Sequence, residues 1–172
     1  HAKERKMRTT LSTNGTLITP EVARDLNNRN MGYVGISLDG LEDTHDKFRR
    51  HKGCWKQALE GIENCKRAGL RTGLRITLTK HNYQDVPQIL DMIVEREINR
   101  VCFYHLVYTG RGKEMIEEDL THEQTRETMD IIIEKTLEIH AQGHDKEVLT
   151  VDNHADGPYM YMWAKKNRPD LA

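Results

Sequence analysis

The stretch Thr72-Gly73-Leu74-Arg75-Ile76-Thr77-Leu78-Thr79 alternates between apolar and polar side chains along its whole length. A period of two residues is typical of a β-strand whose two faces meet different surroundings. Leu74, Ile76 and Leu78 share one face, and Gly73 and the polar residues occupy the other. Because segments with helical periodicity flank this stretch, we predict a strand of a βα unit, and one of its two sides must face a polar interior.

Similar β-rich runs and helical segments alternate on both sides of this strand. The other predicted strands are Thr9 to Thr13, Tyr33 to Leu38, Arg100 to Tyr108 and a short one at Val148 to Val151. The predicted helices are Pro20 to about Asn30 with Thr19 as N-cap, Trp55 to Ala68, Asp85 to Glu97, Thr121 to Gly143 and an aromatic one around Tyr159 to Trp163. Charged or irregular loops are expected at Leu41 to Gly53 and at Thr109 to Leu120.

The alternation of strands and helices predicts an α/β fold with a parallel sheet and right-handed crossovers. Four such units fit either part of a (β/α) barrel or an open doubly wound sheet, and periodicity alone does not separate the two. In the barrel, the functional groups are expected at the carboxyl ends of the strands.

The composition narrows the classes of function. The chain has 172 residues, 37% of them hydrophobic and 31% charged, with a formal net charge of -1, which gives no electrostatic reason to expect nucleic acid as a partner. No apolar run is long enough to cross a membrane and no signal peptide opens the sequence, so we expect a cytoplasmic location and no membrane partner. Cys54, Cys65 and Cys102 are widely spaced, which favours buried reduced thiols over a disulfide framework or a metal site.

Polar groups follow all four main strands where a barrel would open. These strand ends are Thr13-Asn14-Gly15, Ser37-Leu38-Asp39-Gly40, Thr77-Leu78-Thr79 and His105-Leu106-Val107-Tyr108. Any one polar strand end is explained by contact with water. Four together favour a binding site at this edge of the sheet.

Several of these segments resemble the radical S-adenosylmethionine family. The similar residues are Thr13-Asn14-Gly15, the run Ile36-Ser37-Leu38-Asp39-Gly40 with His45-Asp46 and Phe48-Arg49 after it, and Thr77-Leu78-Thr79 with Asn82. The run Phe103 to Tyr108 with Gly110-Arg111-Gly112 looks more narrowly like the NirJ-type enzymes of haem d1 synthesis and the related enzymes that deacetylate didecarboxysiroheme. The resemblance covers Thr9 to Gly112 well and Asp152 to Trp163 more loosely.

The resemblance implies S-adenosylmethionine as a cofactor and a set of residues that bind it. Ser37 and Asp39 would bind the ribose hydroxyls, and Arg49 the carboxylate, since a guanidinium fork matches a carboxylate. Asn14, Thr77 and Thr79 are weaker candidates for lining the cofactor site. The alternatives are an ordinary Asp-Gly turn at Asp39 and a solvated basic loop around Arg49.

The substrate implied by the resemblance is a tetrapyrrole with carboxylates around an apolar ring. Arg75 and Arg111 could meet these carboxylates, as could the basic run Arg50-His51-Lys52, although solvation explains surface charges equally well. Gly110 and Gly112 around Arg111 fit either close backbone approach or an ordinary loop. His105 is either a core histidine with a satisfied hydrogen bond or a group that faces substrate, and its place at a strand end favours the second.

The family reaction begins when a [4Fe-4S] cluster reduces S-adenosylmethionine and releases a 5'-deoxyadenosyl radical, which implies an electron donor such as ferredoxin or flavodoxin. The Cys-x3-Cys-x2-Cys arrangement that holds this cluster is absent from the sequence, so no metal ligand is expected in this chain. With His rather than Met at position 1, we interpret the chain as a fragment that is inactive by itself. Residues 1–120 are then expected to form part of the barrel, and residues 121–172 a helical extension toward a C-terminal cluster region.

Three functions remain open from the sequence. The first is a radical enzyme that removes propionate or acetate side chains from a sirohaem-derived tetrapyrrole, and the second is a radical peptide or sulfatase maturase, which shares Ile36 to Gly40. The third is a non-catalytic barrel fragment that binds a nucleotide or a partner. The roles of Asn153, His154 and Asp156 are also open between a polar substrate contact and a helix-capping loop.

Overall fold

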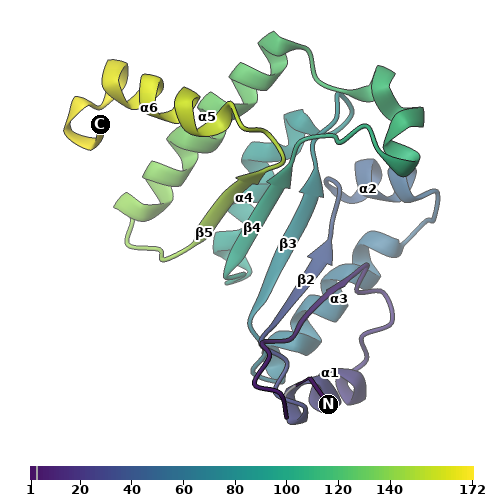
Figure 1. The fold of residues 1–172 in the computed structure, drawn as a ribbon. Coiled ribbons are helices and arrows are strands. Elements are labelled where there is room, and N and C mark those ends of the chain that lie inside the picture. Colours follow the sequence, from purple (N-terminus) through teal and green to yellow (C-terminus); the bar gives the residue numbers. More distant parts are fainter. Residues whose placement is uncertain (3) are drawn as a thin grey trace.

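The computed structural model describes residues 1–2 and 4–172, apart from the side chain of Arg111, and contains one parallel sheet of five strands. The strands pair in chain order and are β1 (Thr10–Thr13), β2 (Tyr33–Ser37), β3 (Thr72–Thr77), β4 (Arg100–Tyr104) and β5 (Glu147–Val151). The sheet is twisted and open, with β1 and β5 at its two edges (Figure 1). The chain therefore forms part of a barrel wall rather than a closed barrel.

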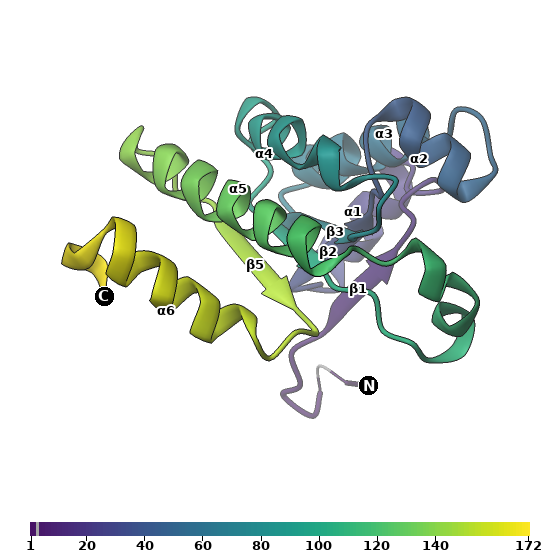
Figure 2. The same ribbon diagram turned by 90° about the horizontal axis from the view of Figure 1, so that it is seen from above.

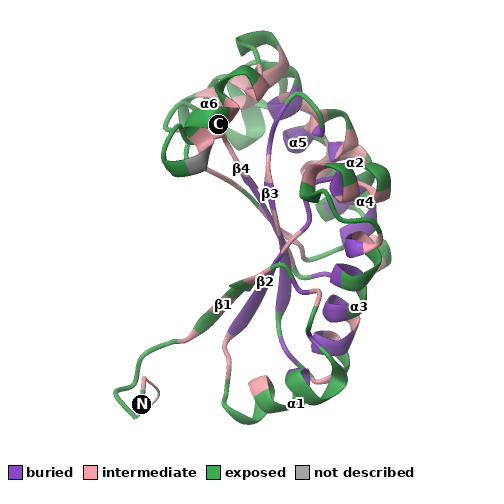
Figure 3. Ribbon diagram, turned by 90° about the vertical axis from the view of Figure 1, so that its right-hand side faces the viewer, coloured by how far each residue is buried: buried purple, intermediate pink, exposed green. Residues whose placement is uncertain are grey.

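Helices connect the successive strands. They are α1 (Pro20–Asn28), α2 (Glu42–Arg49), α3 (Cys54–Arg67), α4 (Val86–Glu95), α5 (His122–Ala141) and α6 (Asp156–Asn167), with short 3-10 segments η1 (Tyr83–Asp85), η2 (Gly110–Glu118) and η3 (Pro169–Leu171). Helices α1, α3, α4 and α5 line one side of the sheet (Figure 2). Helix α6 follows β5 and contacts α5, where the hydroxyl of Tyr159 donates to Asp130 at 2.7 Å. The other face of β1 to β3 carries no layer of helices in the part of the chain that is described (Figure 3).

The hydrophobic core lies between the sheet and this helix layer. Leu74, Ile76 and Leu78 are at most 1% exposed and belong to the same cluster as the buried side chains of α3 and α4. The alternation along β3 is therefore confirmed, because Arg75 and Thr77 point to the opposite, polar side of the sheet and line a cavity there.

The concave face is organised in rows across the strands. One row runs from Ser12 through Gly35, Gly73 and Arg100 to Glu147. Gly35 and Gly73 lie side by side, and a Cβ on Gly35 would meet the Arg75 side chain at 2.8 Å. The two glycines thus leave a shallow trough for larger neighbouring side chains.

Two predicted boundaries are wrong. The expected loop Leu41 to Gly53 contains α2, whose first turn carries Glu42 and Asp43 and whose last turn carries Lys47 and Arg49, an arrangement that complements the helix dipole. The fourth strand is expected from the sequence to run from Arg100 to Tyr108, but β4 ends at Tyr104. One more bond, from the N–H of His105 to the carbonyl of Val151, continues the ladder, and the chain then turns into η2.

The segment 121–172, expected to be a helical extension, contributes both helices and a strand. Helix α5 begins with the predicted capping box, in which Thr121 and Gln124 each accept a hydrogen bond from the other's backbone N–H. Strand β5 then pairs in parallel with β4 and widens the sheet, before α6 begins. No helix among the described residues is long and apolar enough to cross a membrane, and Cys54, Cys65 and Cys102 are all buried free thiols.

Candidate functional site

A groove of about 1460 Å³ opens on the concave face at the carboxyl ends of the strands. Among its lining residues are six of the predicted site residues, namely Ser37, Asp39, Arg49, Arg75, Thr77 and His105. These side chains come from β2, β3, the end of β4 and helix α2, so segments up to 68 positions apart, from Ser37 to His105, meet in one place. The expectation that Ser37, Asp39 and Arg49 converge on one cavity agrees with this geometry.

Asp39 and Arg49 bind each other within this groove. The Nε and a terminal nitrogen of Arg49 donate to Oδ2 of Asp39 at 2.6 and 2.5 Å. The Asp39 side chain is 3% exposed, whereas that of Arg49 is 35% exposed. The buried carboxylate of Asp39 thus fixes the guanidinium of Arg49, and the Arg49 side chain remains partly exposed to the groove.

Helix α2 is also joined to the backbone of Asp39, through His45. The backbone N–H of Asp39 donates to Nδ1 of His45 at 2.9 Å, and Oδ2 of Asp39 lies 3.9 Å from that nitrogen. Burial lowers the pKa of His45 below its usual value of 6.5, although the Asp39 carboxylate opposes this effect. With Nδ1 accepting the backbone bond, His45 is held as the neutral tautomer protonated at Nε2.

Asn82 ties the ends of β2 and β3 together below the groove. Its side-chain NH₂ group donates to the carbonyls of Asp39 and Thr77 at 3.0 and 2.8 Å, and its Oδ1 accepts from the N–H of Thr79. Thr79 is fully buried and lies outside the lining of the groove. The backbone N–H of Thr79 is therefore one of the groups that Asn82 binds to hold the two strand ends together. Contact between Thr79 and a cofactor stays a prediction.

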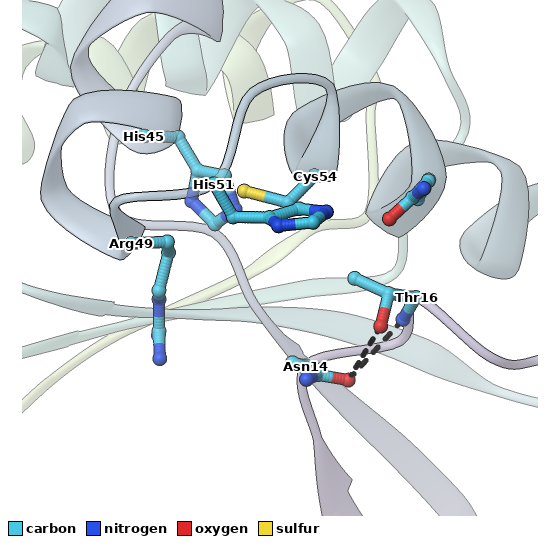
Figure 4. Close-up of a pocket in the computed structure, with 7 residues that line it drawn as sticks. Asn14, Thr16, His45, Arg49, His51 and Cys54 are labelled. Atoms are coloured by element: carbon cyan, nitrogen blue, oxygen red, sulfur yellow. Dashed lines mark hydrogen bonds between the residues drawn. The ribbon is translucent and has the colours of Figure 1, made fainter.

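A smaller cavity of about 290 Å³ lies next to the groove and shares Arg49 with it (Figure 4). Asn14 lines this cavity from the end of β1 and accepts hydrogen bonds from the N–H and hydroxyl of Thr16. Cys54 also borders it, 3.3 Å from a carboxylate oxygen of Asp46, and burial raises the pKa of this thiol to about 11. Cys54 is therefore a protonated, unreactive thiol at neutral pH.

Arg75 is the cation in the middle of the concave face. Its guanidinium lies over the ring of Tyr104 at 4.5 Å from the centroid. None of the ion pairs formed by the described residues involves Arg75, whereas its neighbour in the next row, Arg100, is paired with Glu147. The charge of Arg75 is consequently available to an anion in the groove.

His105 lies at the mouth of the groove and has a carboxylate partner. Its Nε2 is 3.0 Å from Oδ2 of Asp156, and the two side chains are 13% and 8% exposed. The sequence alternatives for His105 were a core histidine with a satisfied hydrogen bond and a group that faces substrate; the structure gives it a hydrogen-bond partner and a place in the groove lining, and contact with substrate stays a prediction. The side chain of Arg111, the third predicted substrate contact, lies outside the described part of the structure.

Sequence reasoning assigned no site role to His45, Asn82 or Tyr104 and left that of Asp156 open. The weak signals were the placement of His45 and Asn82 shortly after a strand end and of Tyr104 next to His105. Nothing in the sequence connects Asp156 to His105, which precedes it by 51 positions. Across the described residues, no group of three or more His, Cys, Asp or Glu side chains is placed to hold a metal ion.

Parallel strands covered by helices on one side, with polar side chains gathered at their carboxyl ends, define a ligand-binding α/β barrel segment. Residues 1–93 match the family model described as the Radical SAM superfamily, and the chain belongs to this family. Members of the family use S-adenosylmethionine together with a [4Fe-4S] cluster.

Relatives in haem biosynthesis share substantial sequence with the chain. It is 50% identical over 172 residues to the Fe-coproporphyrin III synthase of Methanosarcina barkeri, and the aligned region covers 100% of this chain and 43% of the relative. It is 41% identical over 160 residues to the pre-heme d1 synthase of Dinoroseobacter shibae, covering 92% of this chain and 40% of the relative. The chain thus spans less than half the length of these two relatives.

Solved structures confirm the fold. The structure of Streptococcus suis SuiB bound to the precursor peptide SuiA matches 94% of this chain and 36% of its own, with a TM-score of 0.74 and 17% identity. The structure of anSMEcpe with bound AdoMet matches 83% of this chain and 40% of its own, with a TM-score of 0.69 and 18% identity. The fold is therefore that of radical S-adenosylmethionine enzymes, with the sheet left open.

The donor and acceptor groups in the groove fit S-adenosylmethionine. A ribose would need hydroxyl or carboxylate partners and the cofactor's carboxylate a cation, and the groove lining includes the hydroxyl of Ser37, the carboxylate of Asp39 and the guanidinium of Arg49. The groove of about 1460 Å³ exceeds the usual size of a site for one small molecule, which leaves room for a second ligand.

Proposed function

We propose that this chain is part of a radical S-adenosylmethionine enzyme that removes propionate or acetate side chains from a sirohaem-derived tetrapyrrole. The observation that carries the proposal is the groove itself, where a cofactor end containing Asp39 and Arg49 adjoins an uncompensated cation at Arg75. The names of the two haem-biosynthesis relatives support the tetrapyrrole as substrate.

The cofactor end of the groove is formed by β2, α2 and the ends of β1 and β3. Ser37 and Asp39 bind the ribose hydroxyls, Arg49 binds the carboxylate of the cofactor, and Thr77 and Asn14 line the walls. Asn82 and His45 hold these residues in position through backbone bonds. Reduced at a [4Fe-4S] cluster, the bound S-adenosylmethionine supplies the 5'-deoxyadenosyl radical that abstracts hydrogen from substrate.

The substrate end contains Arg75, Tyr104 and His105, and Arg111 remains a candidate substrate contact from the sequence. The guanidinium of Arg75 lies over the ring of Tyr104 and has no carboxylate partner among the described residues, so it can form a two-pronged pair with a substrate carboxylate. His105 supplies a second polar contact at the opening. A small electron-transfer protein such as ferredoxin or flavodoxin as electron donor, and a cytoplasmic location, complete the proposal.

A radical peptide maturase is the second candidate. The chain is 32% identical over 127 residues to the mycofactocin maturase MftC of Mycolicibacterium smegmatis, covering 72% of this chain. A peptide substrate would use the same cofactor end and would place its backbone, rather than several carboxylates, along the groove.

Anaerobic turnover of the full gene product with didecarboxysiroheme tests the proposal. We expect 5'-deoxyadenosine and a tetrapyrrole lighter by its removed side chains, measured by mass spectrometry.

Arg75→Ala should raise the KM for the tetrapyrrole at least tenfold, because the lost ion pair with a substrate carboxylate would reduce the binding free energy by about 1.4 kcal/mol, which is tenfold in affinity. The matched control is Arg126→Ala, which removes an exposed arginine of α5 that does not line the groove. Cofactor cleavage with the tetrapyrrole unchanged would exclude this substrate.

A further inference from the structure

His105 and Asp156 form a hydrogen-bonded pair that the assigned roles do not explain. Oδ2 of Asp156 lies 3.0 Å from Nε2 of His105, and both side chains are largely buried. A carboxylate that is 8% exposed is unfavourable without a donor, and His105 is its only side-chain partner among the described residues. The contact between these two residues is thus a fixed feature of the fold.

Backbone bonds hold both partners in place. The N–H of His105 donates to the carbonyl of Val151 at 3.0 Å, which extends the pairing of β4 with β5 by one residue. Asp156 is the first residue of α6, where the helix dipole stabilises a negative charge. Asn153 closes the preceding turn, because its Oδ1 accepts from the N–H of Ala155 and its carbonyl from that of Asp156.

This pairing determines which ring nitrogen is left for a ligand. With Nε2 donating to Asp156, the free polar atom of the imidazole is Nδ1, and His105 lines the groove. A carboxylate on one ring nitrogen fixes the tautomer and stabilises the imidazolium that forms when the other nitrogen takes a proton. Structural histidines can have the same partner, but they do not border an open groove.

The surroundings indicate the chemistry of that ligand. Tyr104 directly precedes His105, and the guanidinium of Arg75, from β3, lies over the Tyr104 ring. Arg75 has no carboxylate partner in the described chain and lines the same groove as His105. A planar ligand with several carboxyl groups can reach both positions. The groove is large enough for such a ligand beside the cofactor.

We propose that Asp156 is a positioning residue that orients His105 so that Nδ1 binds one carboxyl group of the tetrapyrrole while Arg75 binds another. A carboxyl group is ionised at neutral pH, so the proton comes from the solvent: an O–H bond of a hydronium ion breaks, an N–H bond forms at Nδ1, and the imidazolium then lies between Asp156 and the ligand carboxylate. This inference rests on the proposed function for the identity of the ligand. It adds that α6, which follows the sheet, completes the substrate end of the groove.

The test combines a spectroscopic signature with binding in the full gene product. In protein labelled with ¹⁵N-histidine, long-range ¹H–¹⁵N spectra report the tautomer of each imidazole, and the signal of His105 is assigned by its absence in His105→Ala. We expect the tautomer protonated at Nε2 in the wild type, a mixture of tautomers in Asp156→Ala, and a new Nδ1 proton when didecarboxysiroheme is added. Affinity is measured in parallel by absorbance titration.

Binding of didecarboxysiroheme should weaken about tenfold in Asp156→Ala and in His105→Ala, with no further loss in the double variant, because coupled residues give non-additive effects. His144→Ala, which removes an exposed histidine that does not line the groove, is the control and should bind like the wild type. Unchanged tautomer and affinity in Asp156→Ala, with normal binding by the wild type, would overturn the inference alone. Absence of binding by the wild type would overturn the proposed function and the assigned ligand together.

Discussion

Asp39 illustrates at the residue scale how one side chain serves both the fold and the groove. Its backbone N–H, its carbonyl and its carboxylate bind His45, Asn82 and Arg49 respectively. Asp39 therefore fixes the end of β2, helix α2 and the turn that contains Asn82 relative to one another. Any ligand bound at Arg49 is consequently bound to a guanidinium whose position is fixed in advance, which reduces the entropy lost on binding.

Replacing Asp39 by Ala should weaken binding of S-adenosylmethionine at least tenfold and destabilise the fold by about 2 kcal/mol, the cost typical of losing hydrogen bonds to a charged group. Arg49 would lose its partner and the cavity its carboxylate. Calorimetric titration and denaturant unfolding measure the two effects. Asp145→Ala, which removes an exposed aspartate outside the groove, is the control. Affinity equal to that of the wild type would remove Asp39 and its ion pair from the cofactor site.

His45 should make the fold sensitive to mild acid. Burial lowers its pKa below 6.5 in the folded chain, so the unfolded chain binds the proton more readily. The stabilising contribution of neutral His45 is therefore complete above pH 6.5 and decreases as the pH falls below that value. We expect the free energy of unfolding to fall less between pH 7.5 and about 5.5 in His45→Gln than in the wild type, because an amide oxygen can still accept the Asp39 N–H. Equal losses over this range would show that His45 does not contribute.

At the scale of elements, the regular strands and helices could be predicted because apolar residues recur along the sequence at the spacing that places them on the buried face of each element. The alternation in β3 and the capping box of α5 both lie in a few consecutive residues, and both are confirmed. Helix α2 could not be predicted, because its sequence EDTHDKFR has little apolar content and is held by bonds to Asp39, outside the helix. Strand β4 was predicted too long because its end depends on the length of β5, a distant segment.

Part of the site could be predicted from strand ends: Ser37, Asp39, Thr77 and His105 lie at or just after them, and all four line the groove. Arg49 and Arg75, which also line it, were predicted from the family resemblance and from the charge that the substrate would need. The pairs inside the site could not be predicted, since the bond between Asp39 and Arg49 depends on α2 and that between His105 and Asp156 on the position of α6. Side-chain pairing is a tertiary property that local patterns do not encode.

Gly61 and Gly157 should respond in opposite ways to the same substitution. An alanine usually stabilises a helix by up to about 1 kcal/mol relative to glycine. In α3, however, a Cβ on Gly61 would meet the backbone carbonyl oxygen of Gly15 between β1 and α1, so the helix must move away from the sheet. We expect Gly61→Ala to destabilise the chain by about 2 kcal/mol, in the range typical of overpacking.

Gly157 is the matched control for this prediction, because a Cβ there in the first turn of α6 has no heavy atom within 4 Å. Gly157→Ala should leave the free energy of unfolding unchanged or raise it slightly. Urea unfolding followed by circular dichroism gives both values. A stabilised Gly61→Ala variant would mean that α3 does not approach the loop after β1 as closely as the structure indicates.

On the scale of the whole molecule, the open sheet controls how this chain behaves by itself. Strands β1 and β5 each have a partner on one side only, so their outer backbone groups are available to another strand. On β5, Leu149 is 42% exposed and shares the row of Arg75 and Cys102 on the concave face. An exposed edge with an apolar side chain favours strand addition between copies.

We therefore expect the 172-residue chain to self-associate at micromolar concentrations, and Leu149→Lys to shift it toward monomer, because a charge on an edge strand opposes pairing with a second strand. Sedimentation velocity measures the distribution of species for both proteins. Leu17→Lys is the matched control: this leucine is 83% exposed but lies before α1 and outside the strands, so its replacement should leave the association unchanged. If both lysine variants reduce association equally, the cause is net charge rather than the edge, since each adds one positive charge. If neither does, copies of the chain meet through another surface, of which the exposed Tyr161 and Met162 of α6 are the next to be replaced.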